Sequence, residues 1–202
     1  ADQNGSATIT IRGTSNGLTV DDVFVVTVTA VDDVPIVSSA IADQTVNEDD
    51  SNTTIDLSSV FTDVDNENSS ISKAVQANTN TGLVSASISG NTLTLDYQAD
   101  QNGSATITIR GTSNGLTVDD VFIVTVTAVN DEPSFTKGSD KTVLEDSGSS
   151  TYSGWATSIS TGPSNESDQT PTFNVTNDNN SLFSSQPSIN SSGKLTFTPA
   201  SN

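Results

Sequence analysis

The sequence predicts an all-β protein made of tandem Greek-key β-sandwich repeats of about 98 residues, and two observations support this. First, residues 1–35 match residues 99–133 at 32 of 35 positions, so the chain holds an internal duplication with a period of 98 residues. Second, one full period contains seven short β-rich segments separated by turn signals, which is the pattern of an immunoglobulin-type sandwich. No segment has the apolar spacing of a helix of three turns.

The phase of the repeat divides the chain into three parts. Residues 1–35, the first segment, correspond to the C-terminal strands of a repeat. Residues 36–133, the middle unit, make one complete repeat, and residues 134–202, the third unit, correspond to the N-terminal part of a divergent repeat. The third unit keeps the phase, because "DQTVNEDD" at 43–50 returns as "SDKTVLED" at 139–146.

Alternation of apolar and polar residues predicts half-buried strands at 104–110 and 121–129 of the middle unit. In the first of these, Ala105, Ile107 and Ile109 share one face. Further strands are expected at 43–47, 53–60, 70–76, 83–89 and 91–97, with turns at Asp65–Asn66, Ser89–Gly90–Asn91 and Asn114–Gly115.

The composition is strongly acidic. Asp and Glu outnumber Lys and Arg by 25 to 6, which gives a formal net charge of −19. This charge repels nucleic acids and anionic membrane surfaces, so neither is an expected partner. The chain has no Cys, His or Met, which argues against disulfides, zinc sites and catalysis by thiol or imidazole. Ca²⁺ needs only oxygen ligands and is the cation that this composition favours, although an acidic surface that only maintains solubility is the alternative.

Four stretches of the middle unit resemble one known family. They are "TVNED" (45–49), "TIDLSSVFTDVDNEN" (54–68), "GLVSASISGNTLTLDYQADQNGSATITI" (82–109) and "FIVTVTAVNDEP" (122–133). Together they resemble the bacterial cadherin-like tandem repeats of long surface and RTX-type adhesins. The resemblance implies β-sandwich units that run end to end as a stalk on the bacterial cell surface, with Ca²⁺ bound at the joints between units.

The resemblance also implies a set of calcium ligands at two joints. The first joint lies at Asp32 and Asp33, before the middle unit, and the second at Asn130 and Asp131, after it. To these linker residues the resemblance adds a glutamate after the first strand, an acid pair in "LDYQ" and an Asp-x-Asp motif from the following unit. The implied ligands are Asp32, Asp33, Glu48, Asp63, Asp65, Asp96, Gln98, Asn130 and Asp131.

Three departures from the family pattern predict weak calcium binding. Ala128 stands where the cadherin linker begins with Asp, and Ser113 and Gln98 stand where the family has charged ligands. The third unit has "STGPSNESD" at 160–168 where Asp-x-Asp would lie. Because the site has fewer carboxylates, we expect a calcium dissociation constant of roughly 10⁻⁴ to 10⁻³ M, which is typical of extracellular modules.

Each candidate residue also has a structural interpretation without metal. Asp63, Asp65 and Asn66 are also suited to building a turn, and Glu48 and Asp49 to being solvated charges. The aspartates before the last strand of each copy are expected to be surface charge or edge protection. Tyr152 and Trp155 are expected in the core of the third unit rather than in a sugar-binding platform. The aspartates concerned are Asp21, Asp22, Asp119 and Asp120.

These observations predict a structural or adhesive stalk segment of an extracellular bacterial protein. The alternative is a cell-surface module that binds carbohydrate or protein, and an enzyme is not expected, because the acids recur with the domain period. The expected partners are neighbouring repeats of the same protein, without membrane insertion. Residues 1–35 and 134–202 each correspond to part of one unit, so head-to-tail strand exchange between chains is a further prediction.

Overall fold

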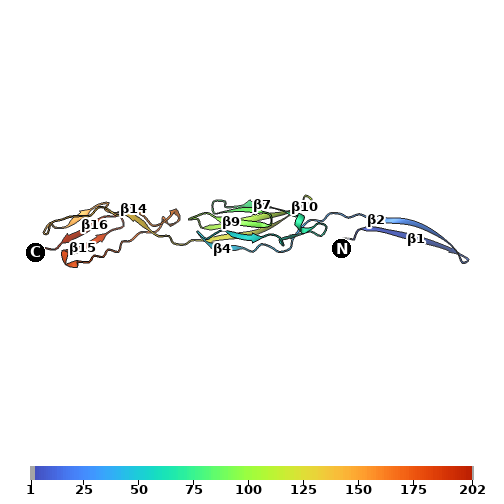
Figure 1. Cartoon of the computed structure of the whole chain (residues 1–202), viewed down its shortest axis with the longest axis horizontal. Helices are drawn as coiled ribbons and strands as arrows, with labels where there is room; N and C mark the ends of the chain where they lie inside the picture. Colours follow the sequence, from blue (N-terminus) through green and yellow to red (C-terminus); the bar gives the residue numbers. More distant parts are fainter. Residues whose placement is uncertain (1–2, 202) are drawn as a thin grey trace.

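The computed structural model describes residues 3–201 as three bodies that follow one another along an elongated rod (Figure 1). A two-stranded hairpin lies at one end, the middle unit lies next, and the third unit lies at the other end. Within the described residues the only helices are three short 3₁₀ helices: η1 (Asn68–Ser70), η2 (Ser164–Glu166) and η3 (Asn180–Leu182). In residues 3–201 no helix is both long and apolar enough to span a bilayer.

The middle unit is a sandwich of two main sheets. One sheet has the order β4–β11–β10–β7 and the other has the order β5–β9–β8. A parallel pairing joins β11 to β4, and the other pairings are antiparallel. The strands are β4 (Gln44–Asn47), β5 (Thr53–Asp56), β7 (Ser72–Asn78), β8 (Val84–Ser89), β9 (Thr92–Tyr97), β10 (Gly103–Ser113) and β11 (Leu116–Thr127), and a short pair, β3 (Ile36–Val37) with β6 (Phe61–Thr62), was not predicted.

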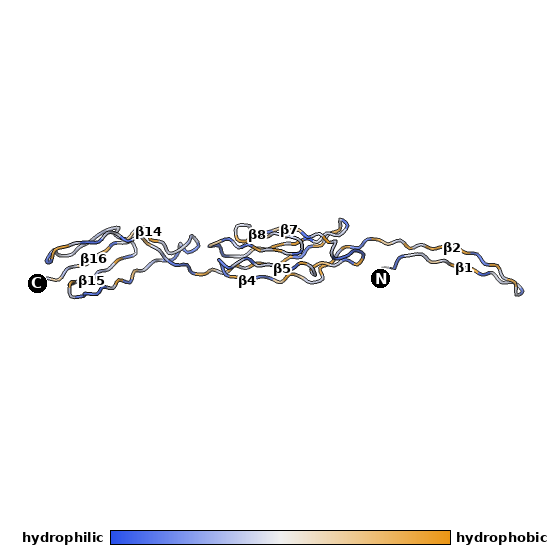
Figure 2. The backbone as a smooth tube through the Cα atoms, viewed as in Figure 1, coloured by the Kyte–Doolittle hydropathy of each residue, from blue (hydrophilic) through white to orange (hydrophobic). Residues whose placement is uncertain are grey.

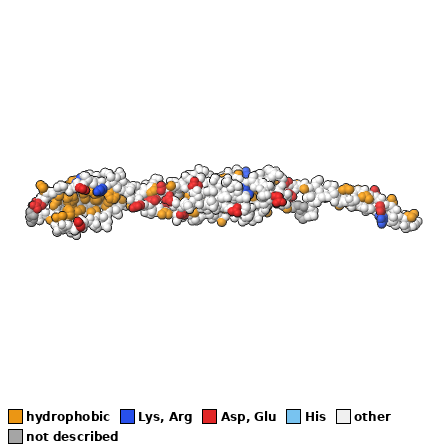
Figure 3. Space-filling model, in the orientation of Figure 1, with side chains coloured by type: hydrophobic (Ala, Val, Ile, Leu, Met, Phe, Trp, Pro, Cys, Tyr) orange, Lys and Arg blue, Asp and Glu red, His pale blue; other side chains and the backbone are white. Residues whose placement is uncertain are grey.

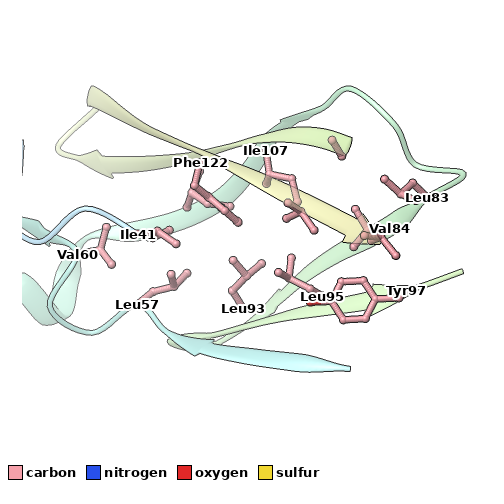
Figure 4. Packing of buried hydrophobic residues seen from close by; sticks show 14 of the residues in the cluster. Ile41, Leu57, Val60, Leu83, Val84, Leu93, Leu95, Tyr97, Ile107 and Phe122 are labelled. Atoms are coloured by element: carbon pink, nitrogen blue, oxygen red, sulfur yellow. The ribbon is translucent and has the colours of Figure 1, made fainter. Parts of the chain in front are cut away.

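Alternate residues of these strands point between the two sheets and form one apolar core (Figure 4). Phe122 of β11 and Ile107 of β10 face Leu93 and Leu95 of β9 across the sandwich. The side chains of Ile107, Leu93 and Leu95 are 0 % exposed and that of Phe122 is 1 % exposed. The predicted all-β sandwich is therefore confirmed, and its core lies where alternation placed it.

The N-terminal hairpin has nearly the same sequence as β10–β11 but a different environment. Its strands β1 (Gly5–Ser15) and β2 (Leu18–Val28) pair only with each other within the described residues. The register is also the same, since Ile9 lies opposite Phe24 as Ile107 lies opposite Phe122. All residues of both strands are exposed, so no second sheet covers this hairpin within residues 3–201 (Figure 2).

The third unit repeats part of the middle unit. Its sheet β13–β16–β15 corresponds to β5–β9–β8, and its pair β12–β14 corresponds to β3–β6. The strands are β12 (Ser134–Thr136), β13 (Ser150–Tyr152), β14 (Thr157–Ser160), β15 (Phe183–Ile189) and β16 (Leu195–Pro199). Residues 141–144 and 171–177, at the places of β4 and β7, are not in strands. Tyr152 and Trp155 are half-buried, and the Tyr152 ring packs on Phe197 at 6.0 Å.

One expectation about surface charge is wrong. Asp120 is only 6 % exposed, and its carboxylate accepts a hydrogen bond of 2.7 Å from the backbone N–H of Ile41. The neighbouring Asp119 does lie at the surface, where it forms an ion pair with Arg110 at 2.7 Å. Successive residues of a strand point to opposite faces, so only one aspartate of the pair faces solvent.

Candidate metal centre

Three aspartates from separate segments meet at the second joint. Asp49 follows β4, Asp100 follows β9 and Asp131 lies in the linker after β11. One carboxylate oxygen from each lies within 4.8 Å of the others. Asp49 and Asp100 both have positive φ, 63° and 56°, a conformation that Asp tolerates better than most residues. These two turns direct both side chains towards the linker, and oxygen atoms so grouped suit a hard cation.

Two buried glutamates connect the units that meet at this joint. Glu48 is 3 % exposed, and its carboxylate accepts hydrogen bonds from the N–H of Val129 at 2.6 Å and from Asn165 Nδ2 at 2.9 Å. Glu166 is 5 % exposed, and its Oε1 accepts a hydrogen bond of 2.7 Å from the N–H of Asp131. Each glutamate therefore ties the linker to a unit, Glu48 from the middle unit and Glu166 from the third.

Several oxygen atoms at this joint are buried without a partner. Asp131 Oδ2, Glu166 Oε2 and Asn165 Oδ1 accept no hydrogen bond within the described residues. A buried acceptor without a donor costs free energy, and a buried carboxylate costs more. These orphaned atoms, together with the aspartate group, form the donor set that a Ca²⁺ ion would satisfy, so the residues fit the ion.

The second joint carries negative charge that no basic side chain of residues 3–201 compensates. In residues 3–201 the two ion pairs are Arg12–Asp21 and Arg110–Asp119, so no Lys or Arg is paired with an acid of this group. Burial raises the pKa of Asp131, and the nearby negative charges of Glu166, Asp49, Asp100 and Glu48 raise it further. The ionised form of Asp131 is thus disfavoured unless a cation compensates the charge.

Gly162 leaves the space that Glu166 occupies. Its φ is +149°, a conformation that residues with a Cβ rarely adopt. A Cβ at this position would overlap Glu166 Oε2 and approach the Cβ of Asp131 to 3.3 Å. A glycine is therefore required for Glu166 to reach the linker.

The first joint has the downstream half of a similar arrangement. Asp65 Oδ2 accepts a hydrogen bond of 2.8 Å from the N–H of Asp33. Asp32 Oδ1 accepts hydrogen bonds from Asn66 Nδ2 at 3.0 Å and from Asn114 Nδ2, at the tip of the β10–β11 hairpin, at 3.2 Å. The linker is thus held by two side-chain amide donors and one carboxylate acceptor of the middle unit.

Asp63 lies beneath this linker and serves as a turn residue. Its Oδ1 accepts hydrogen bonds from the N–H groups of Asp65 and Asn66, at 2.9 and 3.2 Å. The Asp65 N–H lowers the pKa of Asp63 most, and the nearby Ser113 hydroxyl lowers it further. Asp63 Oδ2 and Ser113 Oγ are buried, yet no hydrogen bond of good geometry joins either to a partner within the described residues. Asp63 thus acts as a turn residue through Oδ1, while its Oδ2 has no hydrogen-bond partner within the described residues.

The two joints share one contact. The N–H groups of Asp33 and Asp131, at equivalent positions of the repeat, each donate to a carboxylate of the following unit. The acceptor is Asp65 at the first joint and Glu166 at the second. Glu166 therefore supplies the carboxylate that the sequence of the third unit lacks at the place of the Asp-x-Asp motif.

The structure places some of the predicted ligand residues at the second joint, some at the first joint and two elsewhere. Glu48 and Asp131 meet at the second joint, where Asn130 Oδ1 accepts a hydrogen bond of 2.9 Å from Gln169 Nε2. Asp96 lies on the exposed face of β9 and outside the aspartate group, and Gln98 Nε2 donates a hydrogen bond to the carbonyl of Asp96. The predicted residues of the first joint are Asp32, Asp33, Asp63 and Asp65, which lie together as described.

Sequence reasoning did not single out Asp100 or Glu166 as candidate ligands. Asp100 is the first residue of "DQNG", a turn signal shortly after β9 ends at Tyr97, whereas the predicted Asp96 lies inside that strand. Glu166 is the only glutamate between residues 146 and 202, yet its loop differs too much from the middle unit to be aligned by phase. Asp49 was weighed only as a solvated charge.

Comparison with known proteins gives distant structural similarity alone. No protein-family model matches the chain, and no curated protein matches it. Extracellular cadherin domains 1–4 of protocadherin gamma B7 are similar with 16% identity and a TM-score of 0.47, over 98% of this chain and 49% of that one. Domains EC1-2 of human protocadherin-24 give 13% identity and a TM-score of 0.40, over 63% and 67%. An endo-fucoidan hydrolase of glycoside hydrolase family 107 gives 12% and 0.38, and this chain spans only 30% of its length.

Proposed function

We propose that the chain is a stalk segment of an extracellular bacterial surface adhesin, whose joints are stiffened by Ca²⁺. One observation carries this proposal: Asp49, Asp100 and Asp131 lie within 4.8 Å of one another, beside a buried, half-orphaned Glu166 from the following unit. A group of carboxylates drawn from a unit, a linker and the next unit has little use within one domain, but it suits a cation that holds two domains together.

Each protein residue has a distinct part in this proposal. Asp49 and Asp100 would hold the cation from the middle unit, Asp131 from the linker and Glu166 from the third unit. Glu48 keeps the linker in place through its hydrogen bond with the N–H of Val129. When bound, Ca²⁺ supplies positive charge that compensates these carboxylates, so the free energy of unfolding increases with ligand concentration.

The number of carboxylates suggests tighter binding than the sequence predicted. Glu48, Asp49, Asp100, Asp131 and Glu166 are acidic, and the charge count of a site is one of the factors that set its affinity. We expect a dissociation constant of about 10⁻⁴ M or lower at the second joint. The first joint has fewer carboxylates within residues 3–201 and is expected to bind more weakly.

Calcium titration of matched variants tests the proposal. Isothermal titration and thermal unfolding, in EDTA and in millimolar CaCl₂, would compare the parent chain with Asp100→Asn and Asp96→Asn. Both changes remove one carboxylate near the same end of the middle unit, but only Asp100 belongs to the aspartate group. Asp100→Asn should weaken binding by about tenfold or more, while Asp96→Asn should leave it nearly unchanged.

Two results would contradict the proposal. A parent chain whose melting temperature is the same with EDTA and with calcium has no stabilising site at the joint. A larger effect from Asp96→Asn than from Asp100→Asn would place the ligands where the family resemblance put them, rather than at the three-aspartate group.

A further inference from the structure

Two strands of the middle unit, β4 and β11, run side by side in the same direction. They pair over Gln44–Asn47, with Asn47 opposite Thr127, and every other strand pairing in residues 3–201 is antiparallel. The chain enters the middle unit from the first joint and leaves it at the second, at the opposite end of the unit (Figure 1). A pull on the two linkers therefore moves β4 and β11 in opposite directions along their common axis, which is a shear load.

A shear load stretches all the hydrogen bonds of a ladder together, whereas peeling breaks them one after another. In a parallel ladder these bonds are evenly spaced, so they share the load. Forced unfolding is governed by the rate of unfolding, and not by the equilibrium stability of the whole unit. The bonds between β4 and β11 are therefore expected to matter more to a pulled unit than equally strong bonds elsewhere.

The path of tension through the unit leads to this pair of strands. Figure 3 shows that the molecular surface narrows between the middle and third units, where residues 128–133 follow β11 directly. At the other end the linker meets β3, whose pairing with β6 covers only two residues. A further contact is the backbone N–H of Ile41, which donates to the buried Asp120 of β11 at 2.7 Å. After this contact, β4 is the strand that pairs with β11.

Side chains lengthen the four-residue ladder at both of its ends. Before β4, Asp43 Oδ1 accepts a hydrogen bond of 2.7 Å from the N–H of Ile123. After β4, the N–H of Glu48 donates to the carbonyl of Thr127 at 2.9 Å, and the Glu48 carboxylate accepts a hydrogen bond of 2.6 Å from the N–H of Val129. The sheared contact therefore runs from residue 43 to residue 48.

Thr127 adds a side-chain hydrogen bond within the ladder. Its Oγ1 lies 3.0 Å from the carbonyl oxygen of Val46 and 2.7 Å from Oδ1 of Asn47, so its single proton joins β11 to β4 at either acceptor. Valine has nearly the same shape but cannot donate this bond. Thr127 is therefore a position at which the bond can be removed with little change in side-chain volume.

We infer that the middle unit carries tension along the rod through a clamp, which we define as β4 and β11 with Asp43, Glu48 and Thr127. This function goes beyond the proposed calcium site, because none of the hydrogen bonds in the clamp needs a metal ion. It depends only on residues 36–133 and on the linkers that join this unit to its neighbours. The clamp makes the unit slow to unfold under load even when its equilibrium stability is ordinary.

Single-molecule pulling of the full chain tests the clamp. The chain has no cysteine, so Val31→Cys and Lys137→Cys supply the only attachment points. Both positions are exposed and lie outside the middle unit, so the load enters residues 36–133 through the linkers. At constant force in EDTA, the unit should unfold in one rupture that releases about 300 Å of chain, as expected for a unit of this length.

Thr127→Val in this chain should raise the rate of unfolding at a fixed force by about fivefold, the effect of losing one ordinary hydrogen bond. Tyr97→Phe is the matched control, because it removes a hydroxyl hydrogen bond of 2.8 Å to Thr53 Oγ1 that joins β9 to β5 in the other sheet. Denaturant unfolding followed by circular dichroism should show comparable losses of stability for the two variants. Under force, Tyr97→Phe should unfold at nearly the rate of the parent.

Asp43→Ala gives a second measurement at the other end of the clamp. It removes the acceptor for the N–H of Ile123 and should also raise the forced unfolding rate by about fivefold, whereas Asp96→Ala, on the exposed face of β9, should not change it. Equal forced rates for Thr127→Val and Tyr97→Phe, or a parent unit that extends gradually without a rupture, would overturn the inference. Because every measurement is made in EDTA, a failure of the calcium proposal would leave this inference standing.

Discussion

The negative charge of Asp131 destabilises the joint in which this residue lies. Its backbone N–H is satisfied by Glu166, but its carboxylate faces four other acids and has a buried oxygen without a partner. The raised pKa means that the folded chain binds this proton more tightly than the unfolded chain does. Stability from this group is thus present at low pH and is lost as the pH rises through the raised pKa.

Asp131→Asn should therefore change stability in opposite directions with and without metal. In EDTA near neutral pH, the variant should melt a few degrees higher than the parent, because a repelled charge has been removed. Addition of millimolar calcium should raise the melting temperature of the variant by less than it raises that of the parent chain. Calorimetric scans across pH check this, with Asp140→Asn, at an exposed site outside the group, as the control. A lower melting temperature in EDTA would mean that the charge of Asp131 is already compensated.

Gly162→Ala tests the packing of Glu166 against the linker. The added Cβ meets Glu166 Oε2 in a backbone conformation unfavourable for alanine, and we expect a loss of about 1–3 kcal/mol with weaker calcium binding. Gly148→Ala is the control, because Gly148 also has positive φ, +76°, but has open space around its Cβ. The control should lose about 1–2 kcal/mol of stability and keep its calcium affinity. Equal calcium affinity in both variants would argue against a role for Glu166.

The sequence could predict the joint itself but not every carboxylate that lies there. Asp131 and Glu48 could be predicted from the sequence, because the repeat phase located both the linker and the strand that precedes Glu48. Asp100 was not singled out, and the family resemblance pointed to Asp96 and Gln98 instead, because a sequence pattern does not reveal where a strand ends. The sequence could not predict the position of Glu166, since that position depends on a 3₁₀ helix and on the space left by Gly162. Alternation found the core strands because burial repeats every second residue.

At the level of elements, one hairpin sequence occurs in two environments. In β10–β11 its apolar residues form the core, and in β1–β2 the same residues face solvent within the described chain. Strand formation thus follows from local alternation and the Asn–Gly turn, since both copies form the same register. Burial, in contrast, depends on whether flanking strands are present.

The paired phenylalanines measure what that burial contributes. Phe122→Ala should destabilise the middle unit by about 3–5 kcal/mol, because it removes a fully packed aromatic ring. Phe24→Ala, the same change in almost the same sequence, should leave the unfolding of the middle unit unchanged. Denaturant unfolding followed by the fluorescence of Tyr97, the tyrosine of the middle unit, would separate the two. A comparable loss from Phe24→Ala would show that the N-terminal hairpin stabilises the middle unit.

The whole molecule is a rod whose length depends on the geometry of its joints (Figure 1). Four hydrogen bonds cross the second joint or brace its linker: those of Glu48 with Val129 and Asn165, of Asp131 with Glu166 and of Asn130 with Gln169. Carboxylates that repel one another would weaken these contacts when no cation is present. If the proposed site binds calcium, we expect joint stiffness to respond to the ion more than the stability of the separate units does.

Small-angle scattering should detect this change in stiffness. Removal of calcium with EDTA should shorten the maximum dimension and broaden the distance distribution. Asp100→Asn introduced into the same chain should behave like the EDTA sample even in calcium. Identical scattering curves with and without calcium would show that the hydrogen bonds alone hold the joint.

The near-identity of the two hairpins also has a kinetic consequence. During refolding, residues 5–28 and residues 103–126 compete for the same partner strands in the middle unit. Both choices give almost the same contacts, so the energy landscape has two deep minima that differ in chain topology. A chain that accepts the wrong hairpin traps a long loop and must unfold to correct it. Recent duplication thus gives this protein repeated parts at the cost of an ambiguous assembly order, which divergence between neighbouring units, as in residues 134–202, removes.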